Sequence, residues 1–190
     1  MSERAVALIT GGNRGIGLAI AKALKESGFE AVITYRSGEA PAGYSAVKMD
    51  VTNSQSVDEA FSECEAKFGI PEVIVCNAGI MALPQLEQVY GLEKHLVVNH
   101  LGHFILVNRL LPQVQAAPQG RVVVVSSLGY QWAPEAGIEF DNLDGRRGYE
   151  PNRMYGQSKL ANGLFSLELA RRLRESGATT TSNAVHPGII

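Results

Sequence analysis

Cysteine is scarce in this sequence, and long apolar runs are missing altogether. The 190 residues include two cysteines, Cys64 and Cys76, too few for a disulfide framework or a four-cysteine zinc site. No run of about 18 or more apolar residues occurs, so the sequence predicts no transmembrane helix and no membrane partner. The opening residues, MSERAVALIT, lack the basic flank and cleavage site of a signal peptide. These features favour a cytoplasmic protein.

An excess of charge of one sign is missing as well. The chain has 17 Lys and Arg residues against 19 Asp and Glu residues, a net charge of −2. This balance provides no basic field to attract nucleic acid, so we expect no nucleic-acid partner. Hydrophobic residues make up 45% of the chain, and no linker or low-complexity tract divides it. Residues 1–190 are therefore predicted to form a single domain with a sizeable core.

Short apolar runs recur along the chain, and valine and isoleucine dominate several of them. These runs barely alternate with polar residues, a pattern typical of strands buried on both faces of a parallel sheet. The predicted strands are Ala5–Thr10, Ala31–Tyr35, Ala46–Met49, Val73–Cys76, Val122–Val125 and Asn183–Val185.

Segments with helical periodicity separate these runs. The first has Ile16, Ile20 and Leu24 on one face, and the second carries an apolar stripe from Val57 to Phe68. Two longer helices are expected at Leu92–Leu111, ending near Pro112, and at Asn152–Arg174. The alternation predicts a doubly wound α/β fold, with a parallel sheet of about six strands and helices on both faces. Residues 129–153 lack periodicity, which favours a long functional loop.

A glycine-rich segment lies directly between the first predicted strand and the first predicted helix. Free N–H groups at a helix N-terminus bind pyrophosphate, and glycines let the backbone approach it. We therefore expect dinucleotide contacts from Gly11, Asn13, Arg14, Gly15, Ile16 and Gly17. The alternative is a capping turn without a ligand, which the position between strand and helix disfavours.

The end of the second predicted strand bears on the choice of cofactor. An acidic residue there holds the ribose hydroxyl of NAD, whereas an arginine accommodates the extra phosphate of NADP. The chain has Arg36 at this point, and Arg14 supplies a second cation. We therefore expect NADPH to be preferred over NADH. The alternative is that both arginines are ordinary solvated surface residues.

Further motifs follow in order. The glycine segment reads T-G-x-x-x-G-x-G, Asn77-Ala78-Gly79 follows the fourth predicted strand, and Tyr155-Gly156-Gln157-Ser158-Lys159 opens the last predicted helix. In these motifs the chain resembles the short-chain dehydrogenase/reductase family. The resemblance implies a Rossmann fold and an oxidoreductase with a nicotinamide cofactor. It also implies further cofactor contacts from Asp50, Val51, Asn77, Ala78, Gly79, Tyr155, Lys159, Pro187, Gly188 and Ile189.

The tyrosine and lysine motif carries the predicted chemistry. Tyr155 and Lys159 are one helical turn apart, on the same face. A free tyrosine has a pKa of about 10, and a nearby ammonium favours the phenolate form. Tyr155 is therefore expected to act as the general acid in carbonyl reduction, or as the base in alcohol oxidation. Lys159 is expected to support it and to bind the nicotinamide ribose.

The resemblance assigns two more catalytic residues. Ser127 aligns with the serine that binds the substrate oxygen, while strand alternation points its rival Ser126 the other way. Asn99 aligns with the asparagine whose site holds a water connected to the lysine. His100 and His103 are interpreted as packing residues, and no metal site is predicted.

The resemblance is uneven along the chain. Residues 1–70 resemble 3-oxoacyl-carrier-protein reductases, and residues from 73 onward resemble retinol-dehydrogenase-type reductases.

The sequence ends soon after Pro187-Gly188, so the last strand and the substrate lid of the family are expected to be lacking, with broad specificity as the result. Tyr130 and Trp132 are candidates for a substitute apolar wall. Members of the family associate through two long helices, and both are expected here, so the resemblance implies a homo-oligomer, a dimer or tetramer.

The function favoured by the sequence is an NADPH-dependent carbonyl reductase of small-molecule ketones and aldehydes. A nucleotide-sugar epimerase or dehydratase is a second possibility, which the glycine spacing argues against. A cofactor-binding protein without turnover, truncated before its lid, is a third. Retention of Asn99, Ser127, Tyr155 and Lys159 favours the reductase.

Overall fold

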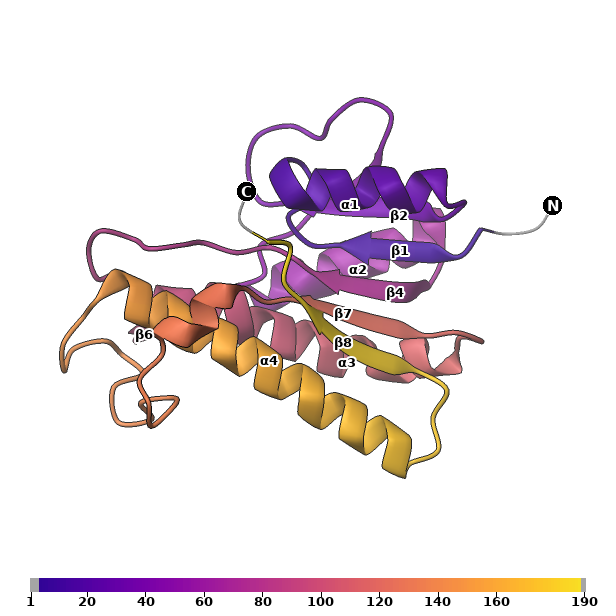
Figure 1. Ribbon diagram of the computed structural model, residues 1–190. Coiled ribbons are helices and arrows are strands. Elements are labelled where there is room, and N and C mark those ends of the chain that lie inside the picture. The colour runs from indigo at the N-terminus through magenta and orange to yellow at the C-terminus, as the bar shows by residue number, and fades with distance from the viewer. Residues whose placement is uncertain (1–3, 189–190) are drawn as a thin grey trace.

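A parallel sheet of six strands runs through the computed structural model, which describes residues 4–188 (Figure 1). The strand order is β3-β2-β1-β4-β7-β8, and every neighbouring pair is parallel. The predicted doubly wound Rossmann fold is thus confirmed. The strands are β1 (Val6–Ile9), β2 (Glu30–Tyr35), β3 (Ser45–Lys48), β4 (Pro71–Cys76), β7 (Arg121–Val125) and β8 (Thr181–Val185).

The strand order reverses at β1 and β4, and this reversal determines where a ligand can bind. Strands β2 and β3 lie on one side of β1, whereas β4, β7 and β8 extend the sheet on the other. Connections therefore leave the carboxyl ends of β1 and β4 in opposite directions and open a crevice between them. The predicted glycine loop and the Asn77-Ala78-Gly79 turn both lie at this point.

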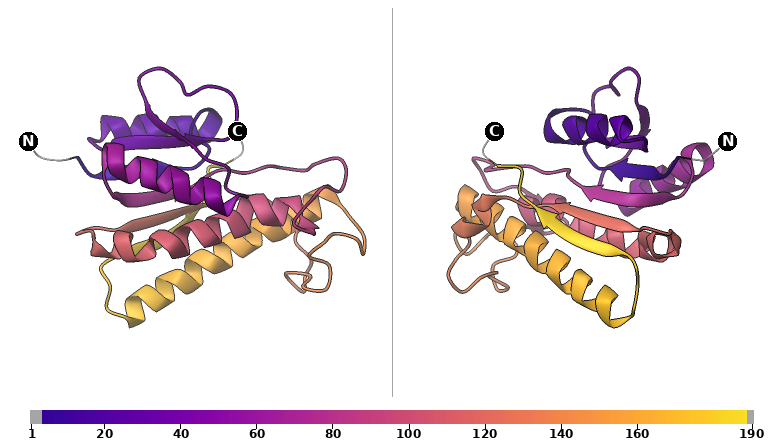
Figure 2. Two further views of the ribbon diagram at one scale, coloured as in Figure 1. Left: turned by 180° about the vertical axis from the view of Figure 1, so that it is seen from behind. Right: turned by 45° about the vertical axis from the view of Figure 1, so that its right-hand side comes forward.

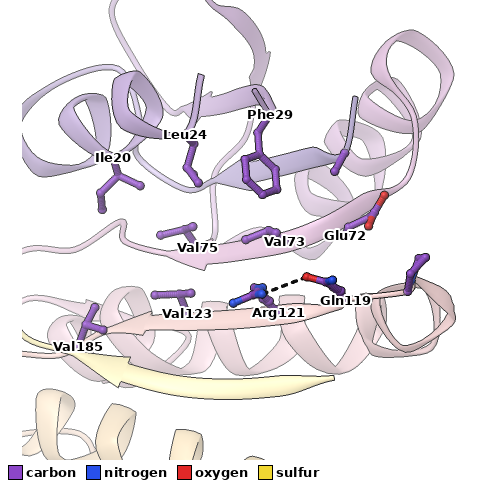
Figure 3. A pocket seen from close by; sticks show the side chains of 12 residues that line it. Ile20, Leu24, Phe29, Glu72, Val73, Val75, Gln119, Arg121, Val123 and Val185 are labelled. Carbon is purple, nitrogen blue, oxygen red and sulfur yellow. Dashed lines mark hydrogen bonds between the residues drawn. The ribbon is translucent and has the colours of Figure 1, made fainter. Parts of the chain in front are cut away.

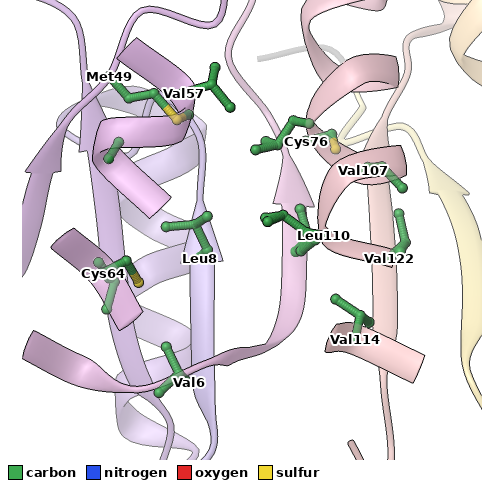
Figure 4. Packing of buried hydrophobic residues seen from close by; sticks show 14 of the residues in the cluster. Val6, Leu8, Met49, Val57, Cys64, Cys76, Val107, Leu110, Val114 and Val122 are labelled. Carbon is green, nitrogen blue, oxygen red and sulfur yellow. The ribbon is translucent and has the colours of Figure 1, made fainter. Parts of the chain in front are cut away.

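Three helices cover one face of the sheet. They are α2 (Ser54–Phe68), α3 (Gly102–Ala116) and α4 (Pro151–Glu175), which lie next to one another when the molecule is seen from behind (Figure 2). Strand residues such as Val6, Leu8 and Val122 form one core cluster here with Cys64 and Val107 of the helices (Figure 4). Burial raises the pKa of both cysteine thiols to about 12, as expected for small core hydrophobes.

The opposite face is covered less completely. Within residues 4–188, helix α1 (Gly15–Glu26) is the one helix that packs there, over β1 and β2. Beside it, over β4 and β7, lies an apolar hollow of about 710 Å³ (Figure 3). Side chains that line it include Leu24, Phe29, Val73, Val123 and Val185.

The third predicted helix differs from the expectation. Residues 88–93 form a small hairpin instead, β5 (Gln88–Val89) with β6 (Leu92–Glu93). Both turn residues have positive φ, 53° at Tyr90 and 75° at Gly91, which suits a two-residue hairpin turn. The helical part begins as a π-helix, Leu96–Leu101, and continues as α3.

The predicted stop at Pro112 is also wrong, because α3 continues through this proline to Ala116. Pro112 has no backbone N–H, so it cannot donate the helical hydrogen bond to the carbonyl of Asn108, one turn earlier. Both residues are on the exposed side of the helix. Water can satisfy that carbonyl. On the other side, Leu110 and Val114 are buried in the core and hold the helix in place.

Candidate active site

The glycine loop connects β1 to α1 in a backbone conformation that favours glycine. Gly11 has a φ of +63°, in the left-handed region. A Cβ at Gly17 would lie 2.4 Å from the Gly11 carbonyl oxygen and 2.5 Å from the Asn77 side-chain nitrogen. Helix α1 begins without a side-chain cap. Its first N–H groups are therefore open to an anionic group of a ligand.

The asparagine motif after β4 braces this loop from the neighbouring strand. Asn77 Nδ2 donates to the carbonyl oxygens of Thr10, at 2.8 Å, and Gly11, at 3.2 Å. In return, Thr10 Oγ1 accepts from the backbone N–H groups of Asn77 and Ala78, both at 2.9 Å. The two sides of the crevice are thus fixed to each other.

A cleft of about 550 Å³ opens over these two loops. It brings together most of the residues predicted to bind the cofactor: Gly11, Asn13, Arg14, Gly15, Ile16, Gly17, Arg36, Asp50, Val51, Asn77, Ala78 and Gly79. Pro187 and Gly188 follow β8 and do not line this cleft, and Ile189 lies outside the described residues.

Charge in the cleft matches the phosphates of a dinucleotide. Arg14 and Arg36 are both exposed, and neither forms an ion pair with another residue in the described range 4–188. Asp50 at the far side uses Oδ1 to accept from the Thr52 N–H and hydroxyl, at 2.9 and 2.7 Å. The crowded glycines, the uncapped helix and the two free cations therefore fit a nicotinamide dinucleotide.

Tyr155 and Lys159 lie on the inner face of α4, and both side chains are buried. Lys159 Nζ is 5.7 Å from the centre of the Tyr155 ring. It donates to the Val125 carbonyl at 2.9 Å, which anchors it at the end of β7 and leaves two N–H groups for other partners. Burial lowers the pKa of Lys159 to about 8.

The two serines at the end of β7 point to different places. Ser126 Oγ donates to the Lys159 carbonyl at 2.9 Å, so this hydroxyl is turned into α4. Ser127 Oγ accepts from the Gly129 N–H at 3.1 Å and caps the 3-10 helix Leu128–Trp132. The Ser127 proton is thereby left available for an external acceptor.

Asn99 is fully buried within the π-helix. Its Oδ1 accepts from the Ile80 N–H at 2.8 Å, and its Nδ2 donates to the Ile80 carbonyl and to Ser158 Oγ, both at 2.9 Å. Ser158 Oγ in turn donates to the Tyr155 carbonyl at 2.7 Å. The side chain of Asn99 thus joins the irregular segment that follows β4 to the helix that carries Tyr155.

His103 has a larger role than packing, which the sequence did not reveal. Its Nδ1 lies 3.0 Å from the Asn99 carbonyl and its Nε2 lies 2.8 Å from Thr10 Oγ1. Because a carbonyl only accepts, Nδ1 carries the proton and the Thr10 hydroxyl donates to Nε2. Burial lowers the pKa of His103 to about 4, so the ring is neutral and bridges the π-helix to the glycine loop.

Aromatic rings form the surroundings of Tyr155. Trp132 lies 6.1 Å from it between ring centres and is 47% exposed, so one side of the indole faces solvent. His95, which is fully buried, meets the tyrosine edge-on at 6.3 Å. Gly129 makes this packing possible, since a Cβ there would lie 2.7 Å from the Tyr155 ring.

Neither a metal centre nor a membrane segment is found in the described part of the chain. Residues 4–188 contain no group of three or more His, Cys, Asp or Glu side chains that could hold a metal ion. In the same range no helix has both the length and the apolar character needed to span a bilayer.

Comparisons with known proteins agree with this geometry. The family model described as short chain dehydrogenase matches residues 5–137. Retinol dehydrogenase 11 of Mus musculus is 38% identical over 97% of this chain and 61% of its own length. The short-chain dehydrogenase TIC 32 A of Brassica napus is 33% identical over 100% of this chain and 65% of its own length. This chain therefore spans less than two thirds of these relatives.

Solved structures match almost the whole chain. An uncharacterized protein from Mycobacterium Paratuberculosis superposes with a TM-score of 0.81 at 31% identity, over 98% of this chain and 70% of its own. A short-chain dehydrogenase from Streptomyces avermitilis gives a TM-score of 0.75 at 26% identity, over 98% of this chain and 67% of its own. By its fold, its motifs and these matches, the chain belongs to the short-chain dehydrogenase family of nicotinamide-dependent oxidoreductases.

Proposed function

We propose that this protein is an NADPH-dependent reductase of ketones and aldehydes that also runs in the alcohol-oxidising direction. The observation that carries the proposal is the distance of 5.7 Å from Lys159 Nζ to the centre of the Tyr155 ring. Lys159 is anchored to the Val125 carbonyl at the end of β7, and Ser127 follows two residues later in the chain. An acid, its cationic neighbour and a hydroxyl donor thus lie at the sheet edge that also holds the dinucleotide cleft.

Each side chain has a definite task in this scheme. Bound NADPH supplies the hydride that reduces the carbonyl carbon. Ser127 donates a hydrogen bond from its hydroxyl to the carbonyl oxygen as negative charge develops there, and it keeps its proton. Tyr155 transfers its phenolic proton to that oxygen, and the Lys159 cation stabilises the phenolate left behind. Asn99 positions α4 through its hydrogen bond to Ser158 Oγ.

The preference for NADPH rests on the two arginines of the cleft. Two guanidinium groups that have no carboxylate partner within residues 4–188 suit the extra phosphate of NADPH, which they can bind by bidentate hydrogen bonds. Arg36→Ala is expected to weaken NADPH binding about tenfold and to leave NADH binding within about twofold. Equal losses of affinity for both cofactors, measured by fluorescence titration, would show that Arg36 does not bind the extra phosphate.

The exposed aromatic side chains near Tyr155 favour bulky, apolar substrates. Leu128, Tyr130 and Trp132 are each about half exposed on the 3-10 helix that begins directly after Ser127. An apolar wall beside the reacting carbonyl binds aromatic or long-chain carbonyl compounds better than small polar ones. Trp132→Ala is expected to raise KM for aryl ketones several-fold; an unchanged substrate profile would contradict this role.

The proposed activity is tested by following NADPH consumption with a mixed panel of aryl ketones, β-keto esters and aldehydes. Tyr155→Phe is expected to lower turnover at least about 100-fold while NADPH still binds, because only the proton donor is lost. Tyr44→Phe is the matched control, since Tyr44 lies under α1 on the far side of the sheet. NADPH binding without turnover in the folded wild-type protein would favour the alternative of a non-catalytic binding protein.

We further propose that the protein is a homo-oligomer that associates through the outer faces of α3 and α4. Four large apolar side chains are exposed there: Phe104, Ile105, Leu164 and Leu167. Phe104 also contacts Phe165 with 5.3 Å between ring centres, which makes the two helices one continuous surface.

A further inference from the structure

A pair of ionisable side chains is buried beside Tyr155, outside the predicted machinery. Glu93 ends β6 and is 2% exposed, and His95 precedes the π-helix and is fully buried. Glu93 Oε1 lies 2.6 Å from His95 Nδ1, and Glu93 Oε2 accepts from the Leu96 N–H at 3.2 Å. Burial of a carboxylate costs free energy, and such partners offset only part of it. The pair therefore lowers the stability of the fold, which indicates that it has a role.

The hydrogen-bond partners determine which ring nitrogen of His95 carries a proton. The Leu83 backbone N–H points at His95 Nε2, 3.2 Å away. A backbone N–H only donates, so Nε2 is the acceptor and Nδ1 carries the proton toward Glu93. Glu93 thus fixes the orientation of the imidazole, and the imidazole holds the Leu83 amide.

The Leu83 peptide is held from its other side as well. The Tyr149 hydroxyl donates to the Leu83 carbonyl at 2.7 Å. Three residues earlier, Asn99 binds both backbone groups of Ile80. Between these attachments, Ala82 adopts a φ of 47°, a left-handed conformation that is strained for alanine. Such strain persists only where the surroundings over-determine the backbone, as they do here.

The held segment runs from the cofactor cleft to the neighbourhood of Tyr155. At one end, Gly79 and Ile80 line the cleft. At the other end, the Leu83 N–H donates to His95, and the His95 ring contacts Tyr155 edge-on. Met81, at the middle of the segment, projects outward and is 57% exposed. The segment therefore exposes an apolar side chain to solvent while its backbone is fixed at both ends.

We propose that the Glu93–His95 pair is a positioning element that holds residues 80–83 as a fixed wall of the substrate site and thereby sets the affinity for bulky carbonyl substrates. This inference rests on the proposed reductase function for its kinetic consequence. Its structural part, the attachment of Leu83, can be measured without any turnover. The two parts can therefore fail separately.

The first experiment measures hydrogen exchange of the Leu83 amide by NMR. His95→Leu fills similar space but offers no acceptor, so the Leu83 amide is expected to exchange at least about tenfold faster than in the wild type. Glu93→Gln retains an acceptor for Nδ1–H and is expected to keep most of the protection. Equal protection in His95→Leu and wild type would overturn the proposal. If His95→Leu fails to fold, His95→Phe, which also offers no acceptor, is used in its place.

The second experiment separates KM from kcat for a bulky aryl ketone and a small aldehyde. His95→Leu is expected to raise KM for the ketone about tenfold, since a displaced wall weakens orientation of the larger substrate. Its kcat for the aldehyde should stay within about twofold, because the chemistry of Tyr155 is untouched. Tyr149→Phe, which releases the other side of Leu83, should shift KM in the same direction.

Tyr90→Phe is the matched control for Tyr149→Phe, because Tyr90 is exposed at the tip of the β5–β6 hairpin. It should leave both constants unchanged. A loss of kcat for both substrates at constant KM in His95→Leu would assign the pair to the chemical step and refute a positioning role. Absence of turnover in the wild type would refute the reductase, while the exchange of Leu83 would still decide the attachment.

Discussion

At the scale of single residues, Lys159 makes the stability of the protein depend on pH. Burial lowers its pKa from 10.5 to about 8, so the unfolded chain binds more protons than the folded one between these values. The free energy of unfolding should therefore rise with pH across this window, by roughly 3 kcal/mol. Below pH 8 both states are protonated, and the full cost of the buried cation is present.

Urea unfolding of Lys159→Met across pH 7 to 11 isolates this contribution, because methionine does not titrate. The variant should be more stable than wild type at neutral pH, and the difference should shrink as the pH rises from about 8 to 10.5. Lys22→Met serves as control, since Lys22 is exposed on α1. A difference that stays constant with pH would show that Lys159 is solvated in the folded state.

Single residues also show how far the sequence could predict the site. The division between Ser126 and Ser127 follows from strand alternation, and the structure turns Ser126 into α4 as that alternation requires. Glu93, His95 and His103 were not predicted, since their roles come from partners such as Leu83 and Thr10. No local spacing encodes partners that packing brings together across the fold.

At the scale of elements, helix α4 contains one glycine that close packing requires and one that it does not require. A Cβ at Gly156 would lie 2.7 Å from the Ala133 nitrogen and 2.8 Å from the Gly129 carbonyl oxygen. At Gly163 nothing lies within 4 Å. Gly163→Ala is expected to stabilise the protein by about 0.5–1 kcal/mol through helix propensity.

Gly156→Ala gains the same propensity but forces α4 away from the 3-10 helix, so a net destabilisation of about 1–3 kcal/mol is expected. Thermal unfolding of the two variants in parallel measures both effects. Since the displaced helix carries Tyr155, Gly156→Ala should also lower turnover. Equal stability of the two variants would mean that this helix contact has room to adjust.

Elements with one dominant signal were predicted within a few residues, as the strands and α1 show. The region 88–116 was not predicted correctly, because a hairpin, a π-helix and an α-helix follow one another there within one apolar stretch. The hairpin turn at Tyr90-Gly91 and the exposed position of Pro112 depend on backbone geometry and on which side faces solvent. Apolar periodicity alone does not distinguish these cases.

At the scale of the whole molecule, two apolar surfaces compete as sites of self-association. One is the hollow over β4 and β7, and the other is the outer face of α3 and α4. A two-fold contact needs a surface that complements itself. Two copies of a hollow leave a void between them, whereas two convex helix pairs can pack together. The helical face is therefore the better interface.

Leu167 is the most exposed of the large apolar side chains on this face, at 66%. Leu167→Glu should dissociate the proposed oligomer, because association through this face would bury an unpaired carboxylate. Light scattering at micromolar concentration should give a lower mass for this variant, with NADPH binding unchanged, since the cofactor cleft lies within one chain. Val185→Glu, in the hollow, should leave the mass of the assembly unchanged. Dissociation by Val185→Glu alone would place the contact on the hollow instead, and a monomeric wild type would exclude both surfaces.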